Sequence, residues 1–252
     1  MDPHDQALSR AFDRQAPLFE RSPAHTDAAA LARLVAFAAP PAGGHVLDAG
    51  CGPALVAEAF LSAGHRVTGV DLSAEMVARA RARCARFGDR ASFAQGRLED
   101  LSPGPAFDAA VSRLVLHHVQ DPLAFLSAQA ARVRPGGVVV VCDHVADPDR
   151  TRAAWHERIE IDRDTTHTRN LTPGELVDLF ARAGLADVRL VEEPLELDFD
   201  EWFDRGTPRA PKAEVRRALL AGRARGFEPV PRPDGGVTIR LVRALVRGER
   251  SA

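Results

Sequence analysis

The chain has 252 residues, of which 45% are hydrophobic and 27% are charged, as is usual for a folded globular protein. Its 33 basic and 35 acidic residues give a formal net charge of -2 and are interleaved along the chain, so the charge pattern does not favour a nucleic-acid partner. Three separated cysteines without metal-ligand spacing, a polar first segment and short apolar stretches predict a cytoplasmic protein without disulfides, a metal site or a membrane span.

Apolar runs and helical patterns alternate between residues 30 and 145. Strands are predicted at 45–49, 66–70, 91–94, 107–112 and 138–142, and helices at 28–39, 54–63, 74–87 and 122–133. The valine-rich run at 138–142 is typical of a strand buried on both faces of a parallel sheet. This alternation predicts a doubly wound α/β fold with a mostly parallel sheet.

The flanking segments are less regular. Before the first strand, the opening 30 residues, with Phe12 and Phe19, predict a helical cap. After residue 145 we expect helices at 150–163 and 173–183, a strand at 186–192, two short helices within 198–228 and a last strand within 235–248. With these two strands, the predicted sheet has seven strands.

The most informative motif spans Val46 to Pro53. It places Asp48 and the turn glycines Gly50 and Gly52 directly after the first predicted strand, and Asp71 closes the second strand nineteen positions after Gly52. A glycine turn lets backbone approach a ligand closely, and an acid at the next strand end can accept hydrogen bonds from both hydroxyls of a ribose. The spacing therefore predicts a site for a nucleoside-bearing ligand.

Two details distinguish this motif from a dinucleotide site. The run from Gly50 to Leu55 lacks the third glycine of the Gly-x-Gly-x-x-Gly pattern, and the Asp48 carboxylate would repel a pyrophosphate. The same carboxylate suits a cationic amino group, and S-adenosylmethionine carries an ammonium and no phosphate. The segments VLDAGCGPA and GVDLS resemble the class I S-adenosylmethionine-dependent methyltransferases.

The resemblance implies a set of cofactor-binding positions on this chain. They are Asp48, Gly50, Cys51, Gly52, Asp71, Leu72, Met76, Leu98, Glu99 and Ser112. Met76 follows Asp71 by five residues and either covers the adenine or packs in the core. Arg97 stands where the family usually has an acid, so the resemblance leaves that contact to the backbone of Leu98 and to Glu99 or Asp100.

Candidates for acceptor chemistry follow the fourth and fifth strands. The segment LHHVQDP resembles small-molecule methyltransferases of the ubiquinone and menaquinone biosynthesis type, and Asp164, His167 and Arg169 resemble an Asp-x-x-His-x-Arg segment of the C-methyltransferases among them. Imidazoles can accept a proton near neutral pH. The candidates are His167, His117, His118, His144, Asp164 and Arg169. A structural or cofactor-shell role for the histidine pair, or a polar loop fixed by an Asp–Arg pair, fits the same residues.

The resemblance implies a single domain over 1–252, with a cap at 1–40, a cofactor-binding core at 41–145 and an acceptor side with a lid and the final strands at 146–252. In the family the final strand is antiparallel and lies at the edge of the sheet. Trp155, Phe199, Trp202 and Phe203 favour an apolar or aromatic small-molecule acceptor, or else they pack the lid or a dimer interface. The acceptor atom stays open between oxygen, carbon, nitrogen and sulfur, as does the choice between monomer and homodimer.

Two other functions compete with methyl transfer. One is a non-methylating member of the same fold that uses bound S-adenosylmethionine in a structural role or a rearrangement. The other is a dinucleotide-dependent oxidoreductase, which is disfavoured because the chain has no tyrosine for a Tyr-x-x-x-Lys pair. Nucleic-acid methylation is disfavoured because Ser112-Arg113-Leu114-Val115 stands where base-modifying enzymes carry an Asn/Asp-Pro-Pro-Tyr motif.

Overall fold

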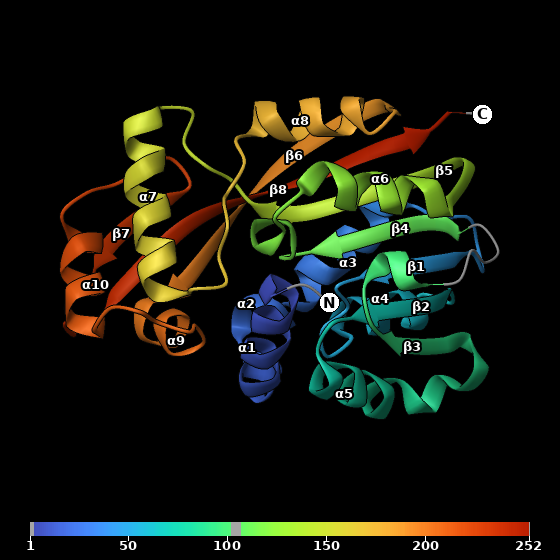
Figure 1. Cartoon of the computed structure of the whole chain (residues 1–252), viewed down its shortest axis with the longest axis horizontal. Helices are drawn as coiled ribbons and strands as arrows, with labels where there is room; N and C mark the ends of the chain where they lie inside the picture. Colours follow the sequence, from blue (N-terminus) through green and yellow to red (C-terminus); the bar gives the residue numbers. More distant parts are fainter. Residues whose placement is uncertain (1–2, 102–106, 252) are drawn as a thin grey trace.

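The protein is described by a computed structural model that covers residues 3–101 and 107–251, and its elements are arranged as a sheet between helical layers (Figure 1). The strands are β1 His45–Ala49, β2 Arg66–Asp71, β3 Ala91–Gln95, β4 Phe107–Arg113, β5 Val133–His144, β6 Leu185–Asp198, β7 Phe227–Pro231 and β8 Val237–Arg250. The helices are α1 Pro3–Phe19, α2 Pro23–Thr26, α3 Ala28–Ala38, α4 Leu55–Ser62, α5 Ala74–Cys84, α6 Pro122–Arg132, α7 Arg150–Arg163, α8 Pro173–Arg182, α9 Phe199–Asp204 and α10 Lys212–Leu220, with short 3-10 turns η1 Ala85–Arg90, η2 Leu98–Asp100 and η3 Leu116–His118.

Seven strands lie in the order β3-β2-β1-β4-β5-β8-β6, and β7 pairs with β8 beside this path. Strands β1 to β5 are parallel to their neighbours, whereas β8 is antiparallel to both β5 and β6. The predicted fold class is confirmed. The last strand is antiparallel as expected, but it lies between β5 and β6 instead of at the edge, because β6 is long enough to pair along the whole outer side of β8.

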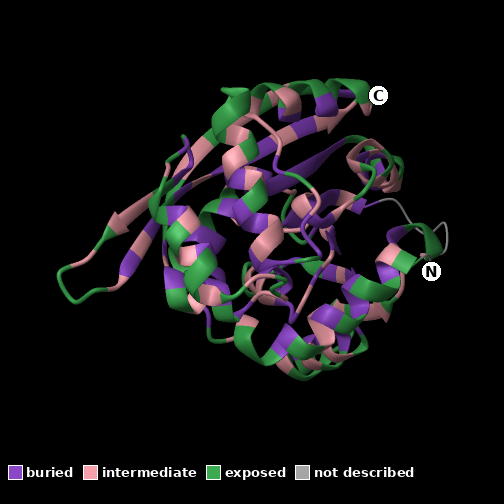
Figure 2. Cartoon of the chain, turned by 60° about the vertical axis from the view of Figure 1, so that its left-hand side comes forward, coloured by how far each residue is buried: buried purple, intermediate pink, exposed green. Residues whose placement is uncertain are grey.

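Helices cover both faces of the sheet, because the strands are apolar on both sides. One face packs against α3, α4 and α5 through a cluster that includes Leu34, Phe60 and Val140. The other face packs against α6 and α8 through Leu126, Phe180 and Val139. Buried positions follow the strands and the inner sides of the helices (Figure 2).

A second lobe extends beyond the carboxyl ends of the central strands. Helices α7, α9 and α10 surround β7 and the neighbouring parts of β6 and β8, on the left in Figure 1. This lobe has its own core, in which Trp202, Phe203, Phe199 and Phe227 are buried and Trp155 packs against them. The aromatic residues that the sequence offered for an acceptor wall therefore mostly pack the lobe itself.

The topology places the motif residues at one edge. The chain turns from β1 toward β2 and β3 on one side and later toward β4 and β5 on the other, so a crevice opens where β1 and β4 end side by side. Helices α1 and α2 lie between this edge and the second lobe (Figure 1). No helix in the described part of the chain is both long and apolar enough to span a bilayer.

Candidate active site

A cavity of about 480 Å³ lies at the carboxyl ends of β1, β2 and β4, and residues of α1 form one of its walls. This volume falls in the range of small-molecule sites. The residues predicted for the cofactor that line it are Asp48, Gly50, Cys51, Gly52, Asp71, Leu72, Met76, Leu98 and Glu99. Ser112 is buried in the sheet behind them and does not line the cavity.

The glycine turn after β1 forms the floor of the cavity. The N–H groups of Gly50 and Cys51 both donate to the Val70 carbonyl, at 2.9 and 3.0 Å, which fixes the turn to the end of β2. Gly50 has φ +73°, and a Cβ at this position would lie 2.6 Å from Cγ2 of Val115. Only glycine fits there without displacing the loop after β4.

Asp71 is held by backbone donors on both carboxylate oxygens. Oδ2 accepts from Gly52 N at 2.8 Å, and Oδ1 accepts from Ser73 N at 2.9 Å. Burial raises the pKa of Asp71, while these two hydrogen bonds act in the opposite direction. The carboxylate therefore faces the cavity in a fixed orientation with lone pairs left for a ligand.

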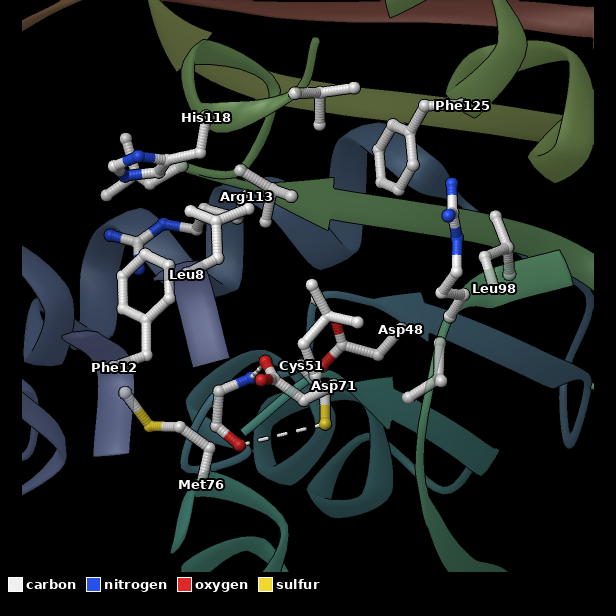
Figure 3. A pocket seen from close by; sticks show the side chains of 18 of the residues that line it. Leu8, Phe12, Asp48, Cys51, Asp71, Met76, Leu98, Arg113, His118 and Phe125 are labelled. Atoms are coloured by element: carbon white, nitrogen blue, oxygen red, sulfur yellow. Dashed lines mark hydrogen bonds between the residues drawn. The ribbon is translucent and has the colours of Figure 1, made fainter. Parts of the chain in front are cut away.

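Asp48 lies beside Asp71 near the end of β1 (Figure 3). Unlike Asp71, it has a hydrogen-bond donor missing from one of its two carboxylate oxygens within the described residues. It is 1% exposed, and among the described residues its Oδ2 has no hydrogen-bond partner. Burial, with a further contribution from the Asp71 charge, raises the pKa of Asp48 to about 7. A cationic ligand group at this point would stabilise the ionised carboxylate.

Apolar side chains enclose the rest of the cavity. Figure 3 shows Met76 and Phe12 on one side, Leu98 and Phe125 on the other, and Leu8 above. These residues come from α5, α1, η2 and α6, so the apolar walls are assembled from distant parts of the chain. Such walls suit the faces of an adenine ring.

Helix α1 is attached to the turn that follows β2. Ser9 Oγ donates to the Leu72 carbonyl at 3.1 Å, and Asp13 accepts from Ser73 Oγ at 2.6 Å. The predicted helical cap is thereby placed across the cavity, and Phe12 and Phe19 both line it.

Arg97, which departs from the family pattern, connects the cap to the opposite wall. Its Nη1 lies 3.0 Å from Oδ2 of Asp5 on α1, and its Nε lies 3.5 Å from Oε2 of Glu99. The residue therefore bridges α1 and the segment after β3, a contact that no local pattern in the sequence indicates.

A second cavity of about 40 Å³ adjoins the first on the side of the second lobe. The two share Phe12, Phe19, His25, Leu114 and His118 as lining residues. Its volume is enough for about three water molecules. His117, His144, Glu160 and Asp164 also line it, which makes it strongly polar at one end.

His117 forms a close pair with Asp143, the last-but-one residue of β5. Its Nδ1 donates to Asp143 Oδ1 at 2.6 Å, and the carboxylate also accepts from the backbone of Leu116 at 2.7 Å and of His144 at 2.8 Å. Burial opposes the charge on His117, but the Asp143 carboxylate outweighs it and raises the histidine pKa. Burial also raises the pKa of Asp143, yet the attraction to His117 brings it down to about 2.

The two other histidines of this cluster are kept neutral. Burial and the charge of His117 lower the pKa values of both His118 and His144 to about 3. Nδ1 of His118 donates to the Thr166 carbonyl at 3.1 Å, whereas Nε2 of His144 has no hydrogen-bond partner among the described residues.

The predicted group of Asp164, His167 and Arg169 is not assembled as a unit. Nε2 of His167 pairs with Glu157 at 2.7 Å, and Arg169 forms an ion pair with Glu175 on the surface. Asp164 instead accepts from Thr166 Oγ1 and pairs with the neighbouring Arg163. His167 and Arg169 line neither cavity.

Comparison with known proteins decides the family. A family model described as a methyltransferase domain matches residues 24–190. The chain is 31% identical over 176 residues to a ubiquinone biosynthesis O-methyltransferase of Xanthomonas axonopodis pv. citri (strain 306). The match covers 66% of this chain and 70% of that protein. The chain belongs to the methyltransferase domain family. The resemblance to class I S-adenosylmethionine-dependent methyltransferases is confirmed.

Other relatives agree with this assignment. The uncharacterized protein YafE of Escherichia coli (strain K12) is 35% identical over 151 residues, which cover 59% of this chain and 72% of that protein. The crystal structure of the YcgJ protein from Bacillus subtilis has a TM-score of 0.79 and 26% identity, and the match covers 88% of this chain and 98% of that one.

The methyltransferase has site residues that sequence reasoning missed. Asp143 was available to the same argument that identified Asp48 and Asp71, since it is an acid at a strand end. Arg113 closes β4 and donates to the carbonyls of Ala24 at 2.7 Å and His25 at 3.2 Å, which ties α2 to the sheet. That contact had no signal in the sequence.

One group within the described residues has the spacing of a metal site. Ligand atoms of His117, Asp143 and His144 lie within 4.8 Å of one another. Each Asp143 oxygen already accepts two N–H bonds, so a metal ion would have to displace some of them. The sequence-based expectation of a site without metal stays a prediction.

Proposed function

We propose that this methyltransferase binds S-adenosylmethionine in the larger cavity and transfers the methyl group to a small apolar or aromatic acceptor that reaches it near the second cavity. The observation that carries this proposal is the pair of carboxylates at adjacent strand ends. Asp71 is fixed by two backbone donors, and Asp48 has a buried oxygen without a partner among the described residues.

The residues present fit the chemical groups of S-adenosylmethionine. Asp71 would accept hydrogen bonds from the two ribose hydroxyls, and the unpartnered oxygen of Asp48 would face the ammonium, directly or through water. Met76 and Leu98 would enclose the adenine. When bound, the cofactor supplies an electrophilic methyl group, and the protein contributes mainly by positioning the acceptor.

The acceptor would lie where the two cavities meet. Phe12, Phe19 and Leu114 line both cavities there, so an apolar or aromatic body would be accommodated. His118 lies at the same junction, and His117, His144 and Asp164 line the polar end beyond it. We assign no acceptor contact to His167 and Arg169.

Calorimetric titration with S-adenosylmethionine and with S-adenosylhomocysteine tests the cofactor assignment, with NADH as the control ligand. We expect both sulfur compounds to bind and Asp71→Ala to weaken them at least about hundredfold, because two hydrogen bonds to a charged group contribute about 1.5–3 kcal/mol each. Asp89→Ala, an exposed acid in η1, should bind like the wild type.

Two outcomes would point to the alternative functions. Preference for NADH would favour an oxidoreductase and would mean that the cavity holds a dinucleotide. Binding of S-adenosylmethionine without labelled methyl appearing in any product of an acceptor screen would favour a non-methylating member of the fold.

A further inference from the structure

The imidazole–carboxylate pair at the edge of the second cavity has a chemical role that the cofactor site does not require. We propose that the second cavity receives the hydroxyl edge of a neutral aromatic acceptor and that His117, oriented by Asp143, removes the hydroxyl proton as the oxygen is methylated. This inference rests on the proposed function and names the acceptor class for that same site.

The orientation of the His117 ring is fixed. Its Nδ1 donates to Asp143 at 2.6 Å, and Asp143 is itself held by backbone N–H groups from η3 and β5. A proton on Nδ1 leaves the lone pair on Nε2, and the ring lines the second cavity. A histidine whose tautomer is set by a buried carboxylate can accept a proton at the other nitrogen.

The neighbouring histidines are less suited to this role. His118 has a carbonyl, not a carboxylate, on its Nδ1, and its ring centroid is 4.1 Å from that of His117. A positive charge on one ring disfavours a positive charge on the other. The Asp143 carboxylate favours the charged form of His117, so the additional proton binds to that ring. His167 has a carboxylate partner, Glu157, but it lines neither cavity.

The charged groups around the cavity favour a neutral acceptor. Arg163 is occupied by the Trp202 carbonyl and Asp164, and Arg205 is paired with Glu201. Glu160 is 4% exposed, contacts His156 Nε2 at 3.3 Å and lines the cavity, so an anionic acceptor would lie against its negative charge. The volume of about 40 Å³ fits a hydroxyl group, while the ring would lie among the apolar residues that both cavities share.

The titratable and charged groups that face His117 come from several elements. They are Asp143 and His144 of β5, His118 of η3, Glu160 and Arg163 of α7, Asp164 and His167 of the following loop, and Arg205 directly after α9. Asp143 is the carboxylate in direct contact with the ring, so its removal should have the largest effect on the protonation of His117.

The proposed step balances in atoms and charge. The acceptor oxygen forms a bond to the methyl carbon while the carbon–sulfur bond breaks, and the electron pair of that bond stays on sulfur. The hydroxyl proton passes to Nε2 of His117, and the resulting imidazolium is paired with the Asp143 carboxylate. An acceptor atom without a proton, such as that of a thioether, would not need this pair.

Nuclear magnetic resonance of the full chain labelled with nitrogen-15 in histidine tests the pair directly. We expect the neutral form of His117 to carry its proton on Nδ1, and the pKa of His117 to lie above the ordinary histidine range. The Asp143→Asn substitution should lower the pKa of His117 and remove the preference for the Nδ1 tautomer. An unchanged His117 titration in Asp143→Asn would overturn the proposal. His45→Gln, at the opposite end of β1, removes a different resonance and serves as the matched control.

Phenol, with toluene as its counterpart without the hydroxyl, tests the acceptor class on protein saturated with S-adenosylhomocysteine. We expect phenol to shift the Nε2 resonance of His117, toluene to leave it unchanged, and His117→Gln to weaken phenol about tenfold, the loss of one hydrogen bond. Perturbation of His167 in place of His117, or no perturbation, would overturn the proposal.

These measurements distinguish a failure of the acceptor assignment from a failure of the proposed function. Failure of S-adenosylhomocysteine to bind would refute the proposed function, whereas binding of it without a response of His117 to phenol would refute only the acceptor assignment. If a chelator changed the His117 and His144 resonances together and Zn²⁺ restored them, the pair would be a metal site and not a proton acceptor.

Discussion

At the scale of single residues, two aspartates one strand apart are under opposite constraints. Asp71 accepts two backbone N–H bonds that support its charge, whereas Asp48 is buried with one oxygen lacking a partner among the described residues. Burying a carboxylate without compensation costs free energy, so the ionised Asp48 lowers the stability of the free protein. We infer that the ligand supplies the missing compensation.

Asp48→Asn should therefore stabilise the free protein at pH 8 while abolishing tight binding of S-adenosylhomocysteine. The pKa of Asp48 is raised from 3.8 to about 7, so its favourable contribution to folding is complete below pH 3.8 and is lost as the pH rises through about 7. Each pKa unit corresponds to about 1.4 kcal/mol, which makes the expected gain at pH 8 a few kcal/mol.

Urea unfolding at pH 8 and at pH 5 measures this effect. The difference between variant and wild type should be large at pH 8 and smaller at pH 5, where the wild-type carboxyl is mostly protonated. A variant that is less stable than the wild type at pH 8 would show that Asp48 has a buried partner in the free protein and would refute this account.

At the scale of elements, α1 covers one side of the larger cavity. Two of its side chains bind the turn after β2, and Asp13 also accepts from the backbone N–H of Glu75, the second residue of α5. Phe12 and Leu8 of the same helix line the cavity. Attachment of α1 to α5 and cofactor retention should therefore be coupled.

Asp13→Ala should increase the dissociation rate of S-adenosylhomocysteine about tenfold, because it removes hydrogen bonds to a charged group worth about 1.5–3 kcal/mol each, part of which water replaces. Stopped-flow displacement measures this rate. Asp178→Ala, an exposed acid on α8, is the matched control and should dissociate like the wild type. Equal rates in all three proteins would mean that α1 does not retain the ligand.

At the scale of the whole molecule, the active site lies between a sheet with two covered faces and a lobe with its own core. The lobe core is centred on Phe227, which is fully buried, stacks on His156 at 3.9 Å between ring centroids and contacts Trp155 and Trp202. Phe227 lines neither cavity. Its contribution should thus be to stability and not to cofactor binding.

Phe227→Ala should lower the free energy of unfolding by about 3–5 kcal/mol, the usual cost of removing a buried phenylalanine. Denaturant unfolding measures the loss, and calorimetry should find the affinity for S-adenosylhomocysteine within about twofold of the wild type. Val191→Ala, which truncates an exposed side chain of β6, should change stability by less than about 0.5 kcal/mol. A large loss of affinity in Phe227→Ala would instead show that the lobe controls the cofactor cavity.

The central fold and the cofactor motif could be predicted from the sequence. Strand periodicity, the glycine turn and the spacing from Gly52 to Asp71 are local features, and the carboxyl ends of parallel strands necessarily meet at one edge. The helix expected at 150–163 coincides with α7 for the same reason, since its pattern is contained in one segment.

The partners of the histidines and the place of the last strand could not be predicted from the sequence. His117 pairs with Asp143 and His167 with Glu157, whereas the sequence pattern associated His167 with Asp164. Insertion of β8 between β5 and β6 and the Arg97–Asp5 bridge are likewise contacts between segments far apart in the chain. Such contacts depend on how elements pack in space, and neither periodicity nor spacing along the chain encodes that packing.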